Sequence, residues 1–384
     1  MRLLLRMALG GLVVIVVAVA VFLLGKQAEP FAPGSQSEQI LKQGPFPVGE
    51  YQIELVDETR ITMANNDIPS KPSRTIETVI WYPKDDGGVA KGLHPLVLYG
   101  HGFSSKKEGG EPVGRHLASH GYIVVSPNFP LSHLNAEGGP NVLDFAQQPG
   151  DISFLIDTVL GWSITSAHMF EGRIDASRIG MMGMSLGGMT AVLLAYHPKY
   201  QDSRIKAFVS AAGGVGIFQE SFFGDQRKPF MMIAGDIDAM VNYQNEARPV
   251  LDRIKDVHLV TIKGGSHAGF SGASKILRWR KNPDNFFCKL IEKKPVHDEV
   301  VPFQDLLDDS MGIAIDPNAG EDCFPKPLPP SLNILRQLML VKVSSLSFFE
   351  SHFSDNEQKR KKYFGYLSSG MAKELSEIEY EAAP

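Results

Sequence analysis

The chain has 384 residues, of which 43% are hydrophobic and 21% are charged, and its formal net charge is −5 at pH 7. This composition is that of a globular protein with one large domain or two ordinary ones, and its 37 glycines and 25 prolines indicate many turns and exclude a disordered chain. Because basic residues are not in excess, it also argues against a nucleic-acid-binding protein.

Residues 1–25 are interpreted as a transmembrane anchor or a signal segment. Within them, residues 7–25 carry no charge and would span about 28 Å as a helix, close to the thickness of a bilayer core. Two arginines precede this run, which favours a membrane anchor with the rest of the chain on the periplasmic or extracellular side. Cleavage after Ala18-Val19-Ala20 is the alternative, and the product would then be secreted. The length of the run favours the uncleaved anchor.

Residues 26–46 are polar and contain proline, so we interpret them as a tether to a domain that covers residues 47–384. Alternating patterns at 51–58 and 75–83 predict two strands. Apolar runs predict six buried strands, at 94–100, 122–128, 177–183, 204–213, 228–235 and 258–264. Helical patterns lie between them, at 109–120, 151–164, 189–198 and 244–256. This alternation indicates an α/β fold with a mostly parallel sheet, helices on both faces, and functional groups at the carboxyl ends of the strands.

Residues 271–335 interrupt this order, and we interpret them as an insertion before a long amphipathic helix at 332–353. The insertion holds the two cysteines of the chain, Cys288 and Cys323. In an oxidising compartment they are expected to form a disulfide, with two unrelated buried thiols as the alternative. No zinc site is expected, because no histidines accompany the cysteines at the spacing of zinc ligands, and no cofactor is expected either.

The segment Gly183-Met184-Ser185-Leu186-Gly187 matches the nucleophile-elbow pattern G-x-S-x-G. In such an elbow a serine occupies a sharp turn between a strand and a helix, and the small flanking residues let the two elements approach closely. A turn that merely packs tightly is the alternative. Since a predicted strand precedes the motif and a predicted helix follows it, the context favours Ser185 as a nucleophile.

A serine nucleophile needs a histidine base that is held by an acid, and in this fold the chain order is serine, acid, histidine. His267 lies in the glycine-rich loop after the last predicted strand, at the required edge of the sheet. Two acids, Asp236 and Asp238, follow an earlier strand. We favour Asp238 as the catalytic acid and expect Asp236 to hydrogen-bond within the loop.

The amides of Leu186 and Phe103 are the expected donors to an oxyanion, because one follows the serine and the other lies in the loop after an earlier strand. His101 precedes the serine in the chain, so its ring is expected to be structural. Apolar residues expected near the substrate are Phe103, Leu186, Phe218, Phe222 and Phe270. Ordinary core packing is the alternative for the last three.

At these residues the chain resembles the branch of the α/β-hydrolases that contains platelet-activating-factor acetylhydrolases and dienelactone-hydrolase-like esterases. The similar stretches lie between residue 47 and about residue 366, and include PLVLYGHGFSS, QQPGDISFLIDTVL, GMSLGG, GDIDAMV and GGSHAGF. The resemblance implies a triad of Ser185, Asp238 and His267. Dienelactone hydrolases use a cysteine nucleophile, so their substrate is not expected here. Secreted polyester hydrolases share the triad layout, but nothing in this sequence singles out a polymer.

The sequence therefore predicts a membrane-anchored serine carboxylic-ester hydrolase that acts on a small-molecule or lipid ester. A phospholipase A2-like hydrolase of short or oxidised acyl chains is one alternative. A non-catalytic anchored binding protein on the same fold is another.

Overall fold

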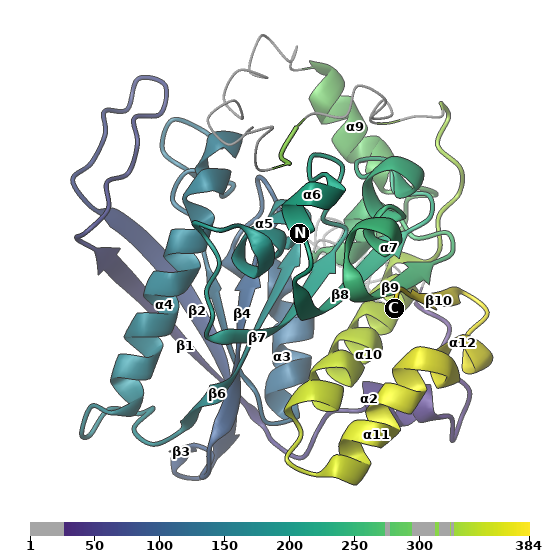
Figure 1. Cartoon of the computed structure of the whole chain (residues 1–384), viewed down its shortest axis with the longest axis horizontal. Coiled ribbons are helices and arrows are strands. Elements are labelled where there is room, and N and C mark those ends of the chain that lie inside the picture. The colour runs from purple at the N-terminus through teal and green to yellow at the C-terminus, as the bar shows by residue number, and fades with distance from the viewer. Residues whose placement is uncertain (1–26, 273–276, 294–311, 315–322, 324–325) are drawn as a thin grey trace, which may run out of the picture.

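The computed structural model describes residues 27–272, 277–293, 312–314, 323 and 326–384 (Figure 1). The predicted anchor or signal segment, residues 1–25, lies outside the described residues. Within the described ranges, no helix is both long and apolar enough to span a bilayer.

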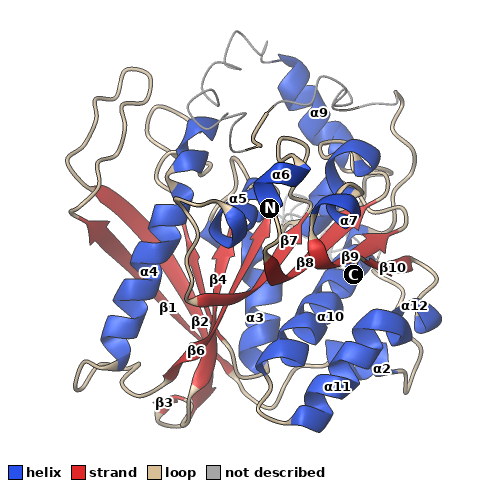
Figure 2. Ribbon diagram, in the orientation of Figure 1, coloured by secondary structure: helices blue, strands red, loops and turns tan. Residues whose placement is uncertain are grey.

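The architecture is built on one ten-stranded sheet with the order β1-β2-β5-β4-β6-β7-β8-β9-β10, and β3 pairs with β2 (Figure 2). From β5 to β9 every neighbouring pair is parallel, whereas β1, β2 and β10 pair in antiparallel fashion. The predicted mostly parallel sheet is therefore confirmed. The strands are β1 Val48–Asp57, β2 Arg74–Asp85, β3 Gly88–Val89, β4 His94–Gly100, β5 Ile123–Pro127, β6 Ile174–Met184, β7 Ile205–Ala211, β8 Arg227–Gly235, β9 Lys255–Ile262 and β10 Ile378–Ala382.

Helices cover both faces of the sheet, because its central strands are apolar on both sides and water must be excluded from each. One face packs against α2 Gln36–Leu41, α3 Glu111–Ser119, α10 Ile334–Phe353 and α12 Met371–Glu374. The other packs against α4 Gln148–Ser163, α5 Leu186–Tyr196, α6 Glu220–Phe223 and α7 Val250–Arg253. The charged helix α11, Glu357–Gly365, packs on α10 and buries none of its own side chains.

The helix predicted at 244–256 is mostly wrong. A short π-helical turn at Tyr243–Ala247 and the four residues of α7 take its place, and β9 already begins at Lys255. Pro249 ends the first turn because it has no amide hydrogen to donate to that turn.

The predicted tether at 26–46 is also wrong for the described residues 27–46, which pack onto the domain. Phe31 and Ile40 are buried in the same core cluster as α10. The Ser37 hydroxyl lies 2.7 Å from the Tyr366 hydroxyl and donates to Glu374 at 2.6 Å. The domain therefore begins before residue 47, because two apolar side chains of this otherwise polar segment are buried in its core.

The predicted disulfide between Cys288 and Cys323 is confirmed, with their Cα atoms 5.6 Å apart. Cys288 lies on α9, Asp284–Lys293, within the described part of the insertion. Both cysteines are buried against Ala239, which directly follows the candidate acid. The insertion is thus attached to the edge of the sheet that carries the candidate site.

Candidate active site

Ser185 stands in the turn between β6 and α5, with the backbone angles φ 54° and ψ −119°. A positive φ is unfavourable for serine, so the surrounding packing must impose this strained turn. A Cβ on Gly183 would overlap the carbonyl group of Gly187, and a Cβ on Gly187 would overlap the carbonyl oxygen of Gly100. Only glycine fits at both positions, and the turn therefore packs tightly and also presents the serine at its tip.

The structure brings together the three side chains that the sequence analysis singled out. His267 Nε2 lies 3.1 Å from Ser185 Oγ, and His267 Nδ1 lies 2.9 Å from Asp238 Oδ2. The other carboxylate oxygen of Asp238 accepts the amides of Met240 and Val241, both at 2.9 Å. Two backbone donors and one imidazole thus orient this carboxylate, and the hydroxyl, ring and carboxylate form one continuous hydrogen-bonded chain.

The structure separates the two candidate acids. Asp236 Oδ1 accepts the Gly264 amide at 2.6 Å and so joins the loop after β8 to the loop after β9. Burial raises the pKa of Asp236. Only Asp238 among these two is bonded to the His267 ring. We call residues 236–241 the acid loop and residues 263–270 the histidine loop.

The loop after β4 reaches the serine at close range. A Cβ on Gly102 would lie 3.2 Å from Ser185 Cβ, so the backbone of this loop passes directly against the serine. Phe103 is next in this loop, and Leu186 is the first residue of α5, where an amide has no partner within the helix. Both predicted donor residues therefore neighbour Ser185.

His101 secures the base of this loop. Its Nδ1 lies 2.8 Å from the Gly102 carbonyl oxygen, and its Nε2 accepts the Phe129 amide at 3.1 Å. Burial lowers the pKa of His101 to about 4, so the ring is neutral at pH 7. These bonds give the ring the structural role that was expected from its place in the chain.

The predicted substrate contacts are only partly compatible with the structure. The Phe103 side chain is 45% exposed, whereas Leu186 is buried. Phe218 and Phe222 lie in the core with their ring centroids 4.7 Å apart, and Phe270 packs into the cluster that contains α10. The expectation that these three phenylalanines face a substrate is therefore wrong, and the alternative of ordinary core packing holds, because all three rings are buried in the two core clusters.

Two residues that the sequence analysis did not single out hold the histidine loop. Gln337 of α10 forms two hydrogen bonds with the backbone of Ser266, at 3.0 and 2.8 Å. Asp284 of α9 accepts the His267 and Ala268 amides at 2.8 Å each. The Asn282-Pro283 pair signals the start of a helix, but no local pattern reveals which distant loop Asp284 contacts.

No cluster of three or more histidine, cysteine, aspartate or glutamate side chains in the described ranges is arranged to hold a metal ion. The site consists of a hydroxyl, an imidazole, a carboxylate and backbone amides. Such a set can transfer a proton, supply a nucleophile and bind a developing negative charge.

Comparison with known proteins relates this arrangement to esterases. The chain is 34% identical over 132 residues to the putative esterase YitV of Bacillus subtilis, covering 33% of this chain and 48% of YitV. It is 32% identical over 107 residues to chlorophyllase-1 of Arabidopsis thaliana, covering 27% and 29% of the two chains. The chain thus spans about half of YitV and less than a third of chlorophyllase-1.

A ferulic acid esterase from Streptomyces cinnamoneus shares the fold, with a TM-score of 0.53 and 18% sequence identity over 84% of this chain and 92% of that one. The model of the PET hydrolase-like family matches residues 36–281, which is well over half of the chain. The chain therefore belongs to the PET hydrolase-like family, and with it to the esterase branch of the α/β-hydrolases.

Proposed function

We propose that this protein is a serine carboxylic-ester hydrolase in which Ser185 is the nucleophile, His267 the general base and Asp238 the acid that orients the base. The observation that carries this proposal is the hydrogen-bonded chain from Ser185 Oγ through both nitrogens of His267 to Asp238. Family membership supports the same chemistry.

In the proposed reaction, His267 Nε2 takes the proton of Ser185 as the hydroxyl oxygen attacks the ester carbonyl. Asp238 keeps the other ring proton on Nδ1, so that Nε2 is free to accept, and it stabilises the imidazolium that forms. His267 then returns the proton to the departing alcohol. A water molecule repeats the sequence on the acyl-enzyme and releases the carboxylic acid.

The negative charge of the tetrahedral intermediate falls near the start of α5. The Leu186 amide and the Phe103 amide are proposed to donate to this oxygen. The strained turn at Ser185 supports this role, since it brings the nucleophile to the N-terminal end of a helix. Amide groups there are unpaired and carry partial positive charge, which stabilises an anion.

The proposed substrates are esters of carboxylic acids, with the acyl group passing close to the exposed ring of Phe103. The matching family is described as PET hydrolase-like, and the similar protein YitV is named a putative esterase. Both descriptions point to hydrolysis of an ester bond. A phospholipid with a short acyl chain contains this bond too and is tested below as a competing substrate.

We also propose that the protein is exported, with the apolar residues 7–25 as its membrane anchor. The disulfide between Cys288 and Cys323 supports this location, because disulfides persist in oxidising compartments and are rare in the cytosol.

A serine-reactive phosphonate probe and a panel of p-nitrophenyl esters of increasing acyl length test the proposed function. The wild-type protein should be labelled and should release p-nitrophenol, whereas Ser185→Ala should do neither while keeping its thermal unfolding midpoint. Phospholipids with short and long acyl chains, assayed in parallel, separate an esterase from a phospholipase A2-like enzyme. A folded wild-type protein that is neither labelled nor active would identify a non-catalytic binding protein instead.

A further inference from the structure

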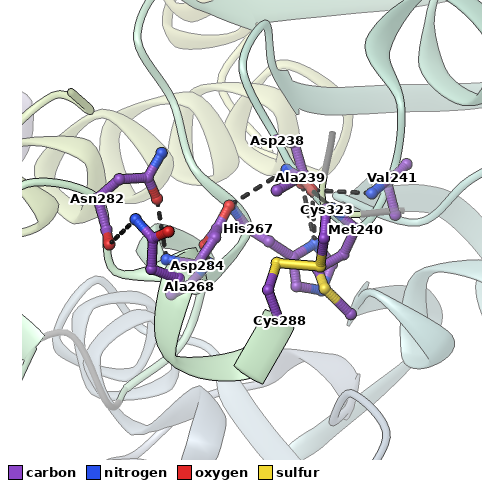
Figure 3. The surroundings of a disulfide bond; sticks show 11 residues. Asp238, Ala239, Met240, Val241, His267, Ala268, Asn282, Asp284, Cys288 and Cys323 are labelled. Atoms are coloured by element: carbon purple, nitrogen blue, oxygen red, sulfur yellow. Dashed lines mark hydrogen bonds and ion pairs between the residues drawn. A yellow bond between two sulfur atoms is a disulfide. The ribbon is translucent and has the colours of Figure 1, made fainter. Parts of the chain in front are cut away.

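The buried carboxylate of Asp284 joins the two loops that carry the candidate acid and base. Its Oδ2 accepts the amides of His267 at 2.8 Å and of Ala239 at 3.2 Å, and its Oδ1 accepts the amide of Ala268 at 2.8 Å. Ala239 directly follows Asp238 in the acid loop. One side chain from the insertion therefore binds the backbone of both loops whose side chains, Asp238 and His267, are hydrogen-bonded to each other (Figure 3).

A carboxylate at this position has an electrostatic cost. Burial raises the pKa of Asp284, the nearby charge of Asp238 raises it further, and attraction to His267 together with the amide donors lowers it. Three backbone donors offset the cost of burial, since charge-assisted hydrogen bonds to amides are strong. The attraction between this negative charge and His267 also favours the protonated ring.

The disulfide holds the helix that carries Asp284. Cys288 is four residues after Asp284, so the two side chains lie on the same face of α9. Its partner Cys323 donates its amide to the Ala239 carbonyl oxygen at 2.6 Å. Ala239 is thus bonded on one side to Asp284 and on the other to Cys323 (Figure 3). The acid loop is therefore linked to α9 by two routes: directly through the Asp284 carboxylate, and through Cys323, which hydrogen-bonds to Ala239 and is covalently bonded to Cys288.

We propose that Asp284 is a positioning residue for the triad, and that the disulfide between Cys288 and Cys323 keeps α9 where this carboxylate can hold both loops. The inference rests on the proposed function, because it assigns a role in that proton transfer. Asp284 does not contact the reacting atoms. It sets the spacing and the orientation of His267 relative to Asp238.

The first test compares Asp284→Ala and Asp284→Asn with the wild type on a p-nitrophenyl ester. Loss of the carboxylate should lower kcat on the order of 10²-fold in Asp284→Ala with little change in KM, since a small displacement of the base affects chemistry more than binding. The Asn variant should lie between the two, because its amide oxygen can still accept from His267 and Ala239. Its amide nitrogen would face the Ala268 amide, and this hydrogen bond would be lost because both groups are donors.

The pH profile of kcat/KM is the readout that a purely structural role would not move. Removal of the negative charge in Asp284→Asn should shift the acid limb to lower pH, because the imidazolium of His267 loses a nearby stabilising charge. Asp236→Asn is the matched control, since it also removes a carboxylate that joins two loops but leaves His267 untouched. This control should keep both kcat and the position of the acid limb. If Asp284→Ala does not fold, the Asn variant decides the question.

The second test removes the disulfide with paired Cys288→Ser and Cys323→Ser substitutions, alone and combined with Asp284→Ala. The paired substitutions alone should lower kcat, and they should add little in the combined variant, because both changes break the same connection. Full activity in both Asp284 variants, or fully additive losses, would overturn the positioning role. The proposed function would still stand in that case, provided that Ser185→Ala is inactive.

Discussion

Replacing Asp238 by asparagine isolates the orienting role of the acid without changing its shape. Asp238 Oδ1 is held by two backbone amides, whereas Oδ2 faces His267 Nδ1 at 2.9 Å. An asparagine must keep its oxygen towards the backbone donors, so its NH2 group takes the place of Oδ2. That group donates to Nδ1 and drives the ring proton onto Nε2, which then cannot accept from Ser185.

The expected loss of kcat in Asp238→Asn follows from this tautomer change. The wrong tautomer removes the general base, and the neutral amide no longer stabilises the imidazolium. Comparable substitutions in a serine triad lower kcat by about 10⁴-fold, which corresponds to roughly 5 kcal/mol of lost transition-state stabilisation. Both backbone bonds at Oδ1 survive, so the free energy of unfolding should change by less than about 1 kcal/mol.

The assay is steady-state hydrolysis of a p-nitrophenyl ester near pH 8, together with urea unfolding of each variant. Asp236→Asn is the control, because Asp236 belongs to the same loop and accepts only a backbone amide in the bonds described above. The reasoning would be refuted if Asp238→Asn kept more than about a tenth of the wild-type kcat, or if Asp236→Asn lost as much as Asp238→Asn.

Three further outcomes are expected. The free energy of unfolding should fall by roughly 3 kcal/mol from His101 alone as pH drops from 6.5 towards 4. The pKa of His101 is about 4 in the folded protein, so its imidazole takes up a proton at higher pH in the unfolded chain than in the folded one. Unchanged urea midpoints across this range would contradict this expectation. Gly187→Ala should lower kcat on the order of 10²-fold by pressing on Gly100, whereas Gly161→Ala, with open space at its Cβ, should leave activity intact; equal activity of both variants would count against the packed elbow. Arg74→Met should cost about 3–5 kcal/mol in chemical unfolding by leaving two buried carboxylates without this partner, and a loss under about 1 kcal/mol would disprove that estimate.

Local patterns in the sequence predicted the sheet and two members of the site. A strand, a glycine-flanked serine and a helix follow one another within a few residues, and this local order predicted the turn at Ser185. Chain order then selected His267 among the histidines. The choice between Asp236 and Asp238 needed the fold, because the two carboxylates are two residues apart and only their contacts distinguish them.

Burial was harder to predict than chemistry. Phe218 lies in a glycine-rich loop and Phe222 on the short helix α6, with polar residues around both, yet both rings pack into the core. Phe31 and Ile40 lie in a polar segment, and α10 covers them although it is about 300 residues away in the chain. Such contacts depend on which distant surface meets the segment, and a local pattern does not contain that information.

The sequence by itself determined the class of fold, the candidate nucleophile and base, and the pairing of the only two cysteines. Each of these follows from short-range periodicity, motif spacing or simple counting. Only the tertiary structure decided which aspartate meets His267, that residues 27–46 belong to the domain, and that Asp284 joins both loops. These features arise from backbone groups and side chains far apart in the chain, and folding alone brings them within hydrogen-bonding distance.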